Sequence, residues 1–177
     1  MYDLAIVGGN VVSSGSVAIA DILIKDGLVA QVLPAGRAGF RAEREVDARG
    51  MLVMSGVIDP HVHFGLRSRG TVTADDFASG TRCAAAGGVT TAIDYADHLP
   101  GMTLSQCAAV RLSEIRPQAA VDYAVHQNCI RIGSDIGDQL AELRRAGIGS
   151  VKVFTTYKDA GYMLEGGDLE VLQSSAS

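Results

Sequence analysis

The sequence contains no tryptophan, only three cysteines and no long hydrophobic run. The few cysteines and the missing apolar run exclude several classes of protein. Cys83, Cys107 and Cys129 are odd in number and form no CxxC pair, so we expect reduced, mostly packed thiols in a cytoplasmic protein. The amino terminus lacks the basic and apolar segments of a signal peptide, and no apolar run approaches the ~20 residues that span a bilayer. A net charge of −5 provides no basic surface for nucleic acid or for a membrane.

What is present is enough apolar material for a core, since 47% of the 177 residues are hydrophobic. Residues 1–54 show short apolar runs separated by turn residues, which predicts strands. Asp26-Gly27 between two such runs is a strong hairpin signal. We therefore expect a small β-sandwich segment or open sheet, with no catalytic cluster of its own.

From residue 55 onward the pattern changes to alternating strands and helices, which is typical of βα units on a parallel sheet. We expect strands at 57–61, 89–95, 121–126 and 151–156. Helices are expected at 74–86, from a T-x-x-Q capping box at Thr103, around 136–147, and from 168. A closed eight-stranded α/β barrel typically needs ~250 residues, so residues 55–177 predict either an open α/β fold or the first half of a barrel.

Two histidines follow the first of these strands, in the segment Asp59-Pro60-His61-Val62-His63. Side chains alternate along a strand, so His61 and His63 can face the same way and reach one metal ion. Their position at the carboxyl end of a parallel strand is where α/β sheets bind ligands, although histidines at this spacing are often ordinary packed or surface residues. His126 is a rival ligand, but a supporting or structural role is favoured for it.

Lys152 lies between two valines on the last predicted strand, where a charged amine is costly unless it is neutralised or paired. One alternative is that its side chain extends to solvent. Another is that its pKa is depressed and the amine takes up CO2, which produces a carbamate anion that can bridge two metals. Tyr157 follows the strand; its phenol could donate to a developing oxyanion, or it could be an ordinary half-buried tyrosine.

The combination of these motifs resembles the cyclic amidohydrolases, namely dihydropyrimidinase and hydantoinase, with allantoinase and dihydroorotase as relatives. The resemblance extends over the whole chain. It is carried by the segments Gly56–His63, Gly70–Phe77, Gly80–Thr91 and Val151–Phe154.

The resemblance implies the amino-terminal part of a (β/α)8 TIM-type barrel, about four of its eight units, and two divalent metal ions, usually zinc. His61 and His63 would bind one ion, the carbamate of Lys152 would bridge both, and Tyr157 would point at the carbonyl oxygen of the substrate. The implied reaction is the hydrolytic opening of a hydantoin or dihydropyrimidine ring, in an enzyme that forms homo-oligomers. Dihydroorotases carry an arginine where this chain has Gly65, which favours the hydantoinase and dihydropyrimidinase type. Arg67 and Arg69 lie nearby, however, so the identity of the substrate is left open.

The same resemblance requires two further metal-binding histidines and an aspartate that acts as the general base, all from later strands. No residue of the chain can be assigned to these roles. We therefore expect an incomplete, inactive fragment of a cyclic amidase. The alternative is a non-catalytic relative of dihydropyrimidinase that acts by association; the presence of His61, His63 and Lys152 favours descent from an enzyme.

Overall fold

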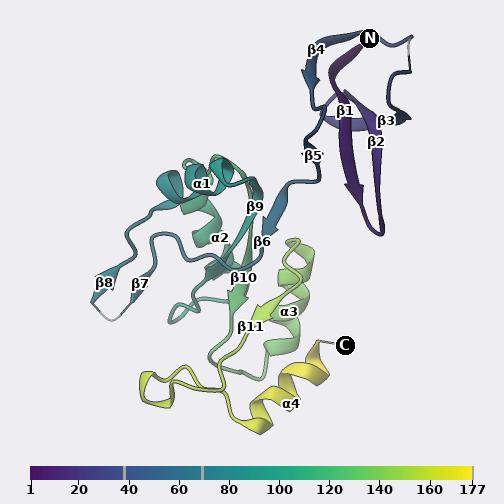
Figure 1. Cartoon of the computed structure of the whole chain (residues 1–177). Coiled ribbons are helices and arrows are strands. Elements are labelled where there is room, and N and C mark those ends of the chain that lie inside the picture. Colours follow the sequence, from purple (N-terminus) through teal and green to yellow (C-terminus); the bar gives the residue numbers. More distant parts are fainter. Residues whose placement is uncertain (38, 69, 177) are drawn as a thin grey trace. The chain divides into compact units, whose positions relative to one another are not determined.

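The computed structural model describes residues 1–37, 39–68 and 70–176, so Arg69 lies outside the described residues. The chain forms two compact units, Met1–Ser55 and Gly56–Ser177 (Figure 1). All described helices belong to the second unit.

The first unit is a five-stranded sheet in which the strands follow the order β3-β2-β1-β4, and β5 also pairs with β1. The first three strands are antiparallel, whereas β4 and β5 run parallel to β1. The predicted hairpin is confirmed: Asp26 and Gly27 have φ values of 52° and 75°, as a two-residue type I′ turn requires. The bounds are β1 Tyr2–Ser13, β2 Ser16–Lys25, β3 Leu28–Pro34, β4 Ala42–Asp47 and β5 Leu52–Val53.

Of the two predicted alternatives, a β-sandwich segment or an open sheet, residues 1–37 and 39–55 form the open sheet, with no second sheet packed on it. Ala5 and Leu23 are fully buried. Large apolar side chains elsewhere in the unit nevertheless remain exposed, which is the physical consequence of the single layer. They include Val17, Ile19, Leu28, Val29 and Val32.

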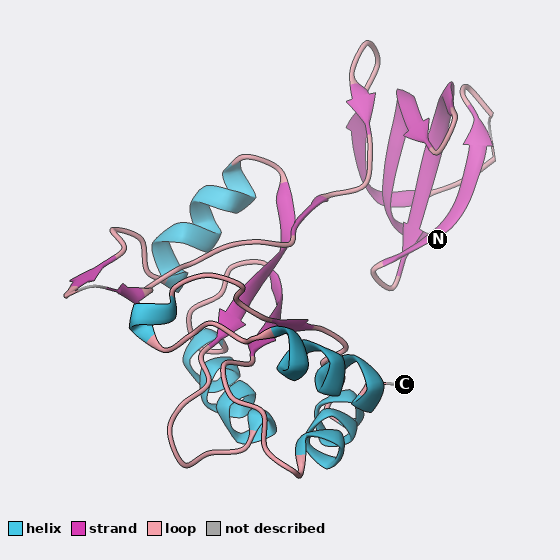
Figure 2. Cartoon of the chain, turned by 90° about the horizontal axis from the view of Figure 1, so that it is seen from below, coloured by secondary structure: helices cyan, strands magenta, loops and turns pink. Residues whose placement is uncertain are grey.

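The second unit has the predicted α/β architecture, a parallel half-barrel sheet in the order β11-β10-β9-β6 with helices between its strands (Figures 1 and 2). Its sheet consists of β6 Val57–Asp59, β9 Val89–Ala96, β10 Asp122–Asn128 and β11 Val151–Lys152. The helices are α1 Phe77–Ala86, α2 Leu104–Ile115, α3 Ile136–Arg145 and α4 Gly166–Ser175, with a short 3-10 turn at Lys158–Ala160. A hairpin of β7 Arg67–Ser68 and β8 Thr71–Val72 lies before α1.

The core of this unit lies between one face of the sheet and the helices. Along β9, Ala92, Asp94 and Ala96 are buried, and Ala96 joins the apolar cluster that α2 and α3 provide. Because side chains alternate along a strand, Ile93 and Tyr95 point to the opposite face. The half-barrel therefore has one face packed by helices and an opposite face that presents side chains such as Tyr95.

Two helix starts show how local sequence sets the element bounds. Thr103 and Gln106 form the predicted capping box of α2. Helix α1 begins at Phe77, three residues later than predicted, because Asp76 is its N-cap and accepts from the Ser79 N–H at 2.7 Å. The predicted strand at 151–156 is also shorter, since pairing with β10 ends at Lys152.

Candidate active site

His61 and His63 lie just after β6, where two hydrogen bonds hold the backbone. The Asp59 carboxylate accepts from the His61 N–H at 3.1 Å, and the Val62 N–H donates to the Ile93 carbonyl of β9 at 3.2 Å. The two Nε2 atoms, of His61 and of His63, are 3.2 Å apart. Two nitrogen ligands on a tetrahedral zinc ion lie about 3.3 Å apart, from Zn–N distances near 2.05 Å. The pair is therefore spaced as two ligands of one ion.

Tyr95, at the end of β9, has the ring around which the other side chains of the site lie. Its centroid lies 4.8 Å from that of His61 and 4.9 Å from that of His63. The Lys152 Nζ is 3.9 Å from the same centroid, a cation–π distance. The structure thus brings His61, His63 and Lys152 around one aromatic side chain.

The amine of Lys152 occupies a half-buried position between two aromatic rings, with Phe154 as the second at 5.2 Å. Burial lowers the pKa of Lys152, and the nearby Asp97 carboxylate opposes that shift. Burial also lowers the pKa of His63, and the positive charge of Lys152 adds to the effect. Both shifts increase the fraction of neutral nitrogen, which is the form that a metal ion or CO2 can use.

Tyr157 lines the same cavity as His63 and Lys152, and the volume of this cavity is about 610 Å³. Phe154 and Tyr162 complete its aromatic side. Tyr157 has a left-handed backbone with φ at 64°, which is unusual for a bulky residue, and its side chain is 53% exposed. Its carbonyl accepts from the N–H groups of Ala160 and Tyr162, which hold this turn in place.

Three residues of the site escaped prediction from the sequence: Tyr95, Asp97 and Asn128. The Asn128 amide donates to the Asp97 carboxylate at 3.0 Å, and both residues line the cavity. The Asn128 Oδ1 is buried and has no hydrogen-bond partner among the described residues. Their position in the sequence could have marked them as candidates, because they lie at the carboxyl ends of β9 and β10. This is the edge at which parallel sheets bind ligands.

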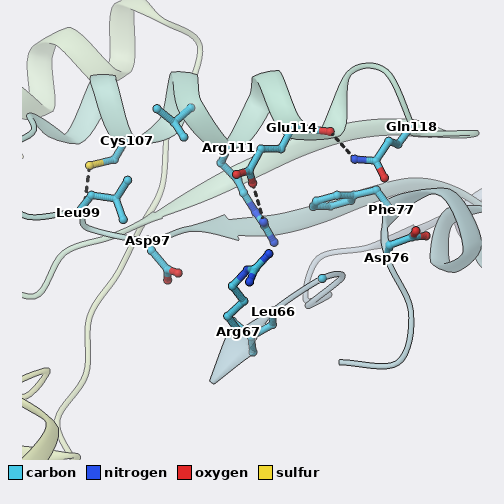
Figure 3. A pocket seen from close by; sticks show the side chains of 12 residues that line it. Leu66, Arg67, Asp76, Phe77, Asp97, Leu99, Cys107, Arg111, Glu114 and Gln118 are labelled. Carbon is cyan, nitrogen blue, oxygen red and sulfur yellow. Dashed lines mark hydrogen bonds and ion pairs between the residues drawn. The ribbon is translucent and has the colours of Figure 1, made fainter. Parts of the chain in front are cut away.

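A second cavity, of about 370 Å³, shares Leu66, Arg67 and Asp97 with the first (Figure 3). Arg111 reaches into it from α2. Its guanidinium donates to the Asp94 carboxylate at 2.7 Å and to the Phe64 carbonyl at 2.8 Å. Because Phe64 follows His63 directly, Arg111 fixes the backbone on one side of the histidine pair.

Two other polar side chains of this unit, Asp76 and His98, have structural partners. Asp76 caps α1, and the His98 Nδ1 accepts from the Ile130 N–H at 3.3 Å. Across residues 1–37, 39–68 and 70–176, no three His, Cys, Asp or Glu side chains converge as a metal site. Among these residues, His61 and His63 therefore form a pair without a third side chain of these types beside them. No helix in the described ranges is long and apolar enough to cross a membrane.

Comparison with known proteins places the chain in a family, although no protein-family model matches it. It is 39% identical over 153 residues to a D-hydantoinase of Geobacillus stearothermophilus, which covers 85% of the chain and 32% of that relative. It is 34% identical over 167 residues to a dihydropyrimidinase of Rattus norvegicus, covering 92% of the chain and 32% of the relative. A crystal structure of D-hydantoinase matches with a TM-score of 0.90 at 34% identity, over 99% of the chain and 38% of that structure.

The half-barrel fold and these similarities define the class of protein, a relative of the cyclic amidohydrolases. More narrowly, the chain belongs to the hydantoinase and dihydropyrimidinase family. It spans about a third of the length of the curated relatives it matches.

Proposed function

We propose that this chain provides half of the active site of a metal-dependent enzyme that opens a cyclic amide ring by hydrolysis, with a hydantoin or a dihydropyrimidine as substrate. The observation that carries the proposal is the grouping of His61, His63 and Lys152 around Tyr95, in a chain related to D-hydantoinases. We assign the site to residues 55–177 and an accessory role to the β segment at 1–54.

The donor set fits divalent metal ions, most simply zinc, because imidazole nitrogens at this spacing suit that ion. When bound, the ions supply Lewis-acid polarisation of the ring carbonyl and an activated water. His61 and His63 would hold one ion. Lys152 would contribute an anionic ligand if its free amine added to CO2, a step that forms an N–C bond and releases one proton.

Tyr157 is proposed to stabilise the transition state. Its exposed side chain lies on the wall of the cavity that also contains His63 and Lys152. A phenol O–H can donate a hydrogen bond to the carbonyl oxygen as negative charge develops there. The left-handed turn at Tyr157 fixes the backbone from which the phenol extends.

The site needs further ligands and a general base from outside these residues, because a catalytic zinc normally has three protein ligands. We therefore propose that the 177-residue chain alone is inactive. Hydantoin, dihydrouracil, allantoin and dihydroorotate are the substrates to test. Ring opening is expected only when the polypeptide also supplies the missing ligands, and turnover by residues 1–177 alone would overturn this account.

The carbamate is tested separately with 13C-labelled bicarbonate and carbon NMR. A carbamate signal is expected for the unchanged chain. It should persist in Lys158→Arg, a matched control at an exposed lysine, and disappear in Lys152→Arg. A signal that survives Lys152→Arg, or that is absent at saturating bicarbonate and zinc, contradicts the role given to Lys152.

A further inference from the structure

His126, at the end of β10, contacts both segments that carry the proposed metal ligands. Its Nε2 lies 3.1 Å from the Pro60 carbonyl oxygen, immediately before His61. Its Nδ1 is hydrogen-bonded to the Ser150 hydroxyl, two residues before Lys152. Its ring also packs on Tyr95, with 5.1 Å between centroids.

The partners of His126 assign its tautomer. The Pro60 carbonyl can only accept, so the Nε2 carries a proton and donates it. In the neutral ring Nδ1 then accepts from the Ser150 O–H. Both nitrogens are occupied, which removes His126 from the list of metal ligands and leaves it as a connection between two chain segments.

This connection bridges elements that are not adjacent in the sheet. Strand β6 pairs with β9, and β11 pairs with β10, so no direct ladder joins the histidine pair to the lysine strand. His126 crosses that gap from the central strand β10. A shift of either segment would break one of its two hydrogen bonds.

We propose that His126 is a positioning residue that sets the placement of His61 and His63 relative to Lys152. The inference rests on the proposed metal site and adds a residue that acts through Pro60 and Ser150, close in sequence to the ligands, without touching the ion. Residues of this kind orient ligands through hydrogen bonds, and their loss typically lowers metal affinity about 10–100-fold.

The test measures zinc affinity of the 177-residue chain by competition with a chromophoric chelator, together with amide hydrogen exchange in residues 57–64 and 150–154. His126→Phe keeps a ring against Tyr95 but removes both hydrogen bonds. We expect about 10-fold weaker zinc binding or more, and faster exchange in both segments. His126→Gln, which keeps an amide donor and acceptor, should restore part of the affinity.

His98→Phe is the matched control, because it removes a histidine from the same unit without a contact to either ligand segment. It should change neither measurement. If His126→Phe does not fold, Ser150→Ala removes one of the two hydrogen bonds and should accelerate exchange in both segments.

The outcomes separate this inference from the proposed function. Zinc binding too weak to measure in the unchanged chain is what the missing ligands allow, and it leaves the proposed function standing. Amide exchange then tests the inference by itself, and faster exchange of both segments in His126→Phe supports it. Unchanged exchange in His126→Phe overturns the connection itself. Faster exchange with unchanged zinc affinity leaves His126 a structural residue and refutes the positioning role.

Discussion

Arg111→Met is expected to destabilise the second unit strongly, because Asp94 would lose its partner inside the protein. The side chains of Arg111 and Asp94 are 16% and 3% exposed, and the shortest distance between their charged groups is 2.7 Å. Removal of one member of a buried ion pair costs about 3–5 kcal/mol, since the other charge stays buried and unpaired. The Arg111 guanidinium also lies 4.6 Å from the Phe77 ring centroid, a contact that methionine retains only in part.

That loss is large relative to the ~5–15 kcal/mol that stabilises an ordinary domain. With a urea m-value of about 2 kcal/mol/M, the unfolding midpoint should fall by about 2 M. Far-ultraviolet circular dichroism is the suitable probe, because all described helices lie in the second unit. A loss below ~1 kcal/mol would refute the view that this pair is buried and tightly coupled.

Two further measurements separate charge from packing. Asp94→Asn combined with Arg111→Met removes the unpaired charge, so the double variant should be more stable than Arg111→Met alone. Burial raises the pKa of Asp94, and Arg111 opposes this rise. Without Arg111 the pKa rises further, so the deficit of the single variant should shrink as the pH falls and Asp94 takes up a proton. A deficit independent of pH would assign the effect to packing.

Three other substitutions test other parts of the structure by the same urea assay. Thr103→Ala removes the side-chain acceptor for the Gln106 N–H and should cost about 1 kcal/mol; no change would contradict the capping box. Leu143→Ala, at a side chain that is 1% exposed, should cost about 2–5 kcal/mol, whereas a cost below 1 kcal/mol would contradict its place in the core. Tyr157→Gly should be about 1 kcal/mol more stable than Tyr157→Ala, because only glycine adopts the left-handed turn without strain; equal stabilities would contradict that backbone.

The elements that local sequence defines were predictable. The Asp26-Gly27 turn and the Thr103 capping box each depend on a few neighbouring residues, and the structure has both. The end of β11 was not predictable in this way. Val153 and Phe154 continue the apolar pattern, but pairing with β10 stops at Lys152, and Phe154 instead bridges to Met163. Such an end is set by a neighbouring strand rather than by the segment itself.

The same limit applies to the site. Alternation along one strand suggested that His61 and His63 share a face, and burial suggested that Lys152 is unusual. The roles of Tyr95 and His126 depend on the register between strands, in which Tyr95 lies beside His126 and Asn128 beside Lys152. A single-residue slip would turn each side chain to the opposite face. The register between strands therefore places the two separate sequence motifs beside each other in one half-site. A slip in that register would break the hydrogen bonds of His126.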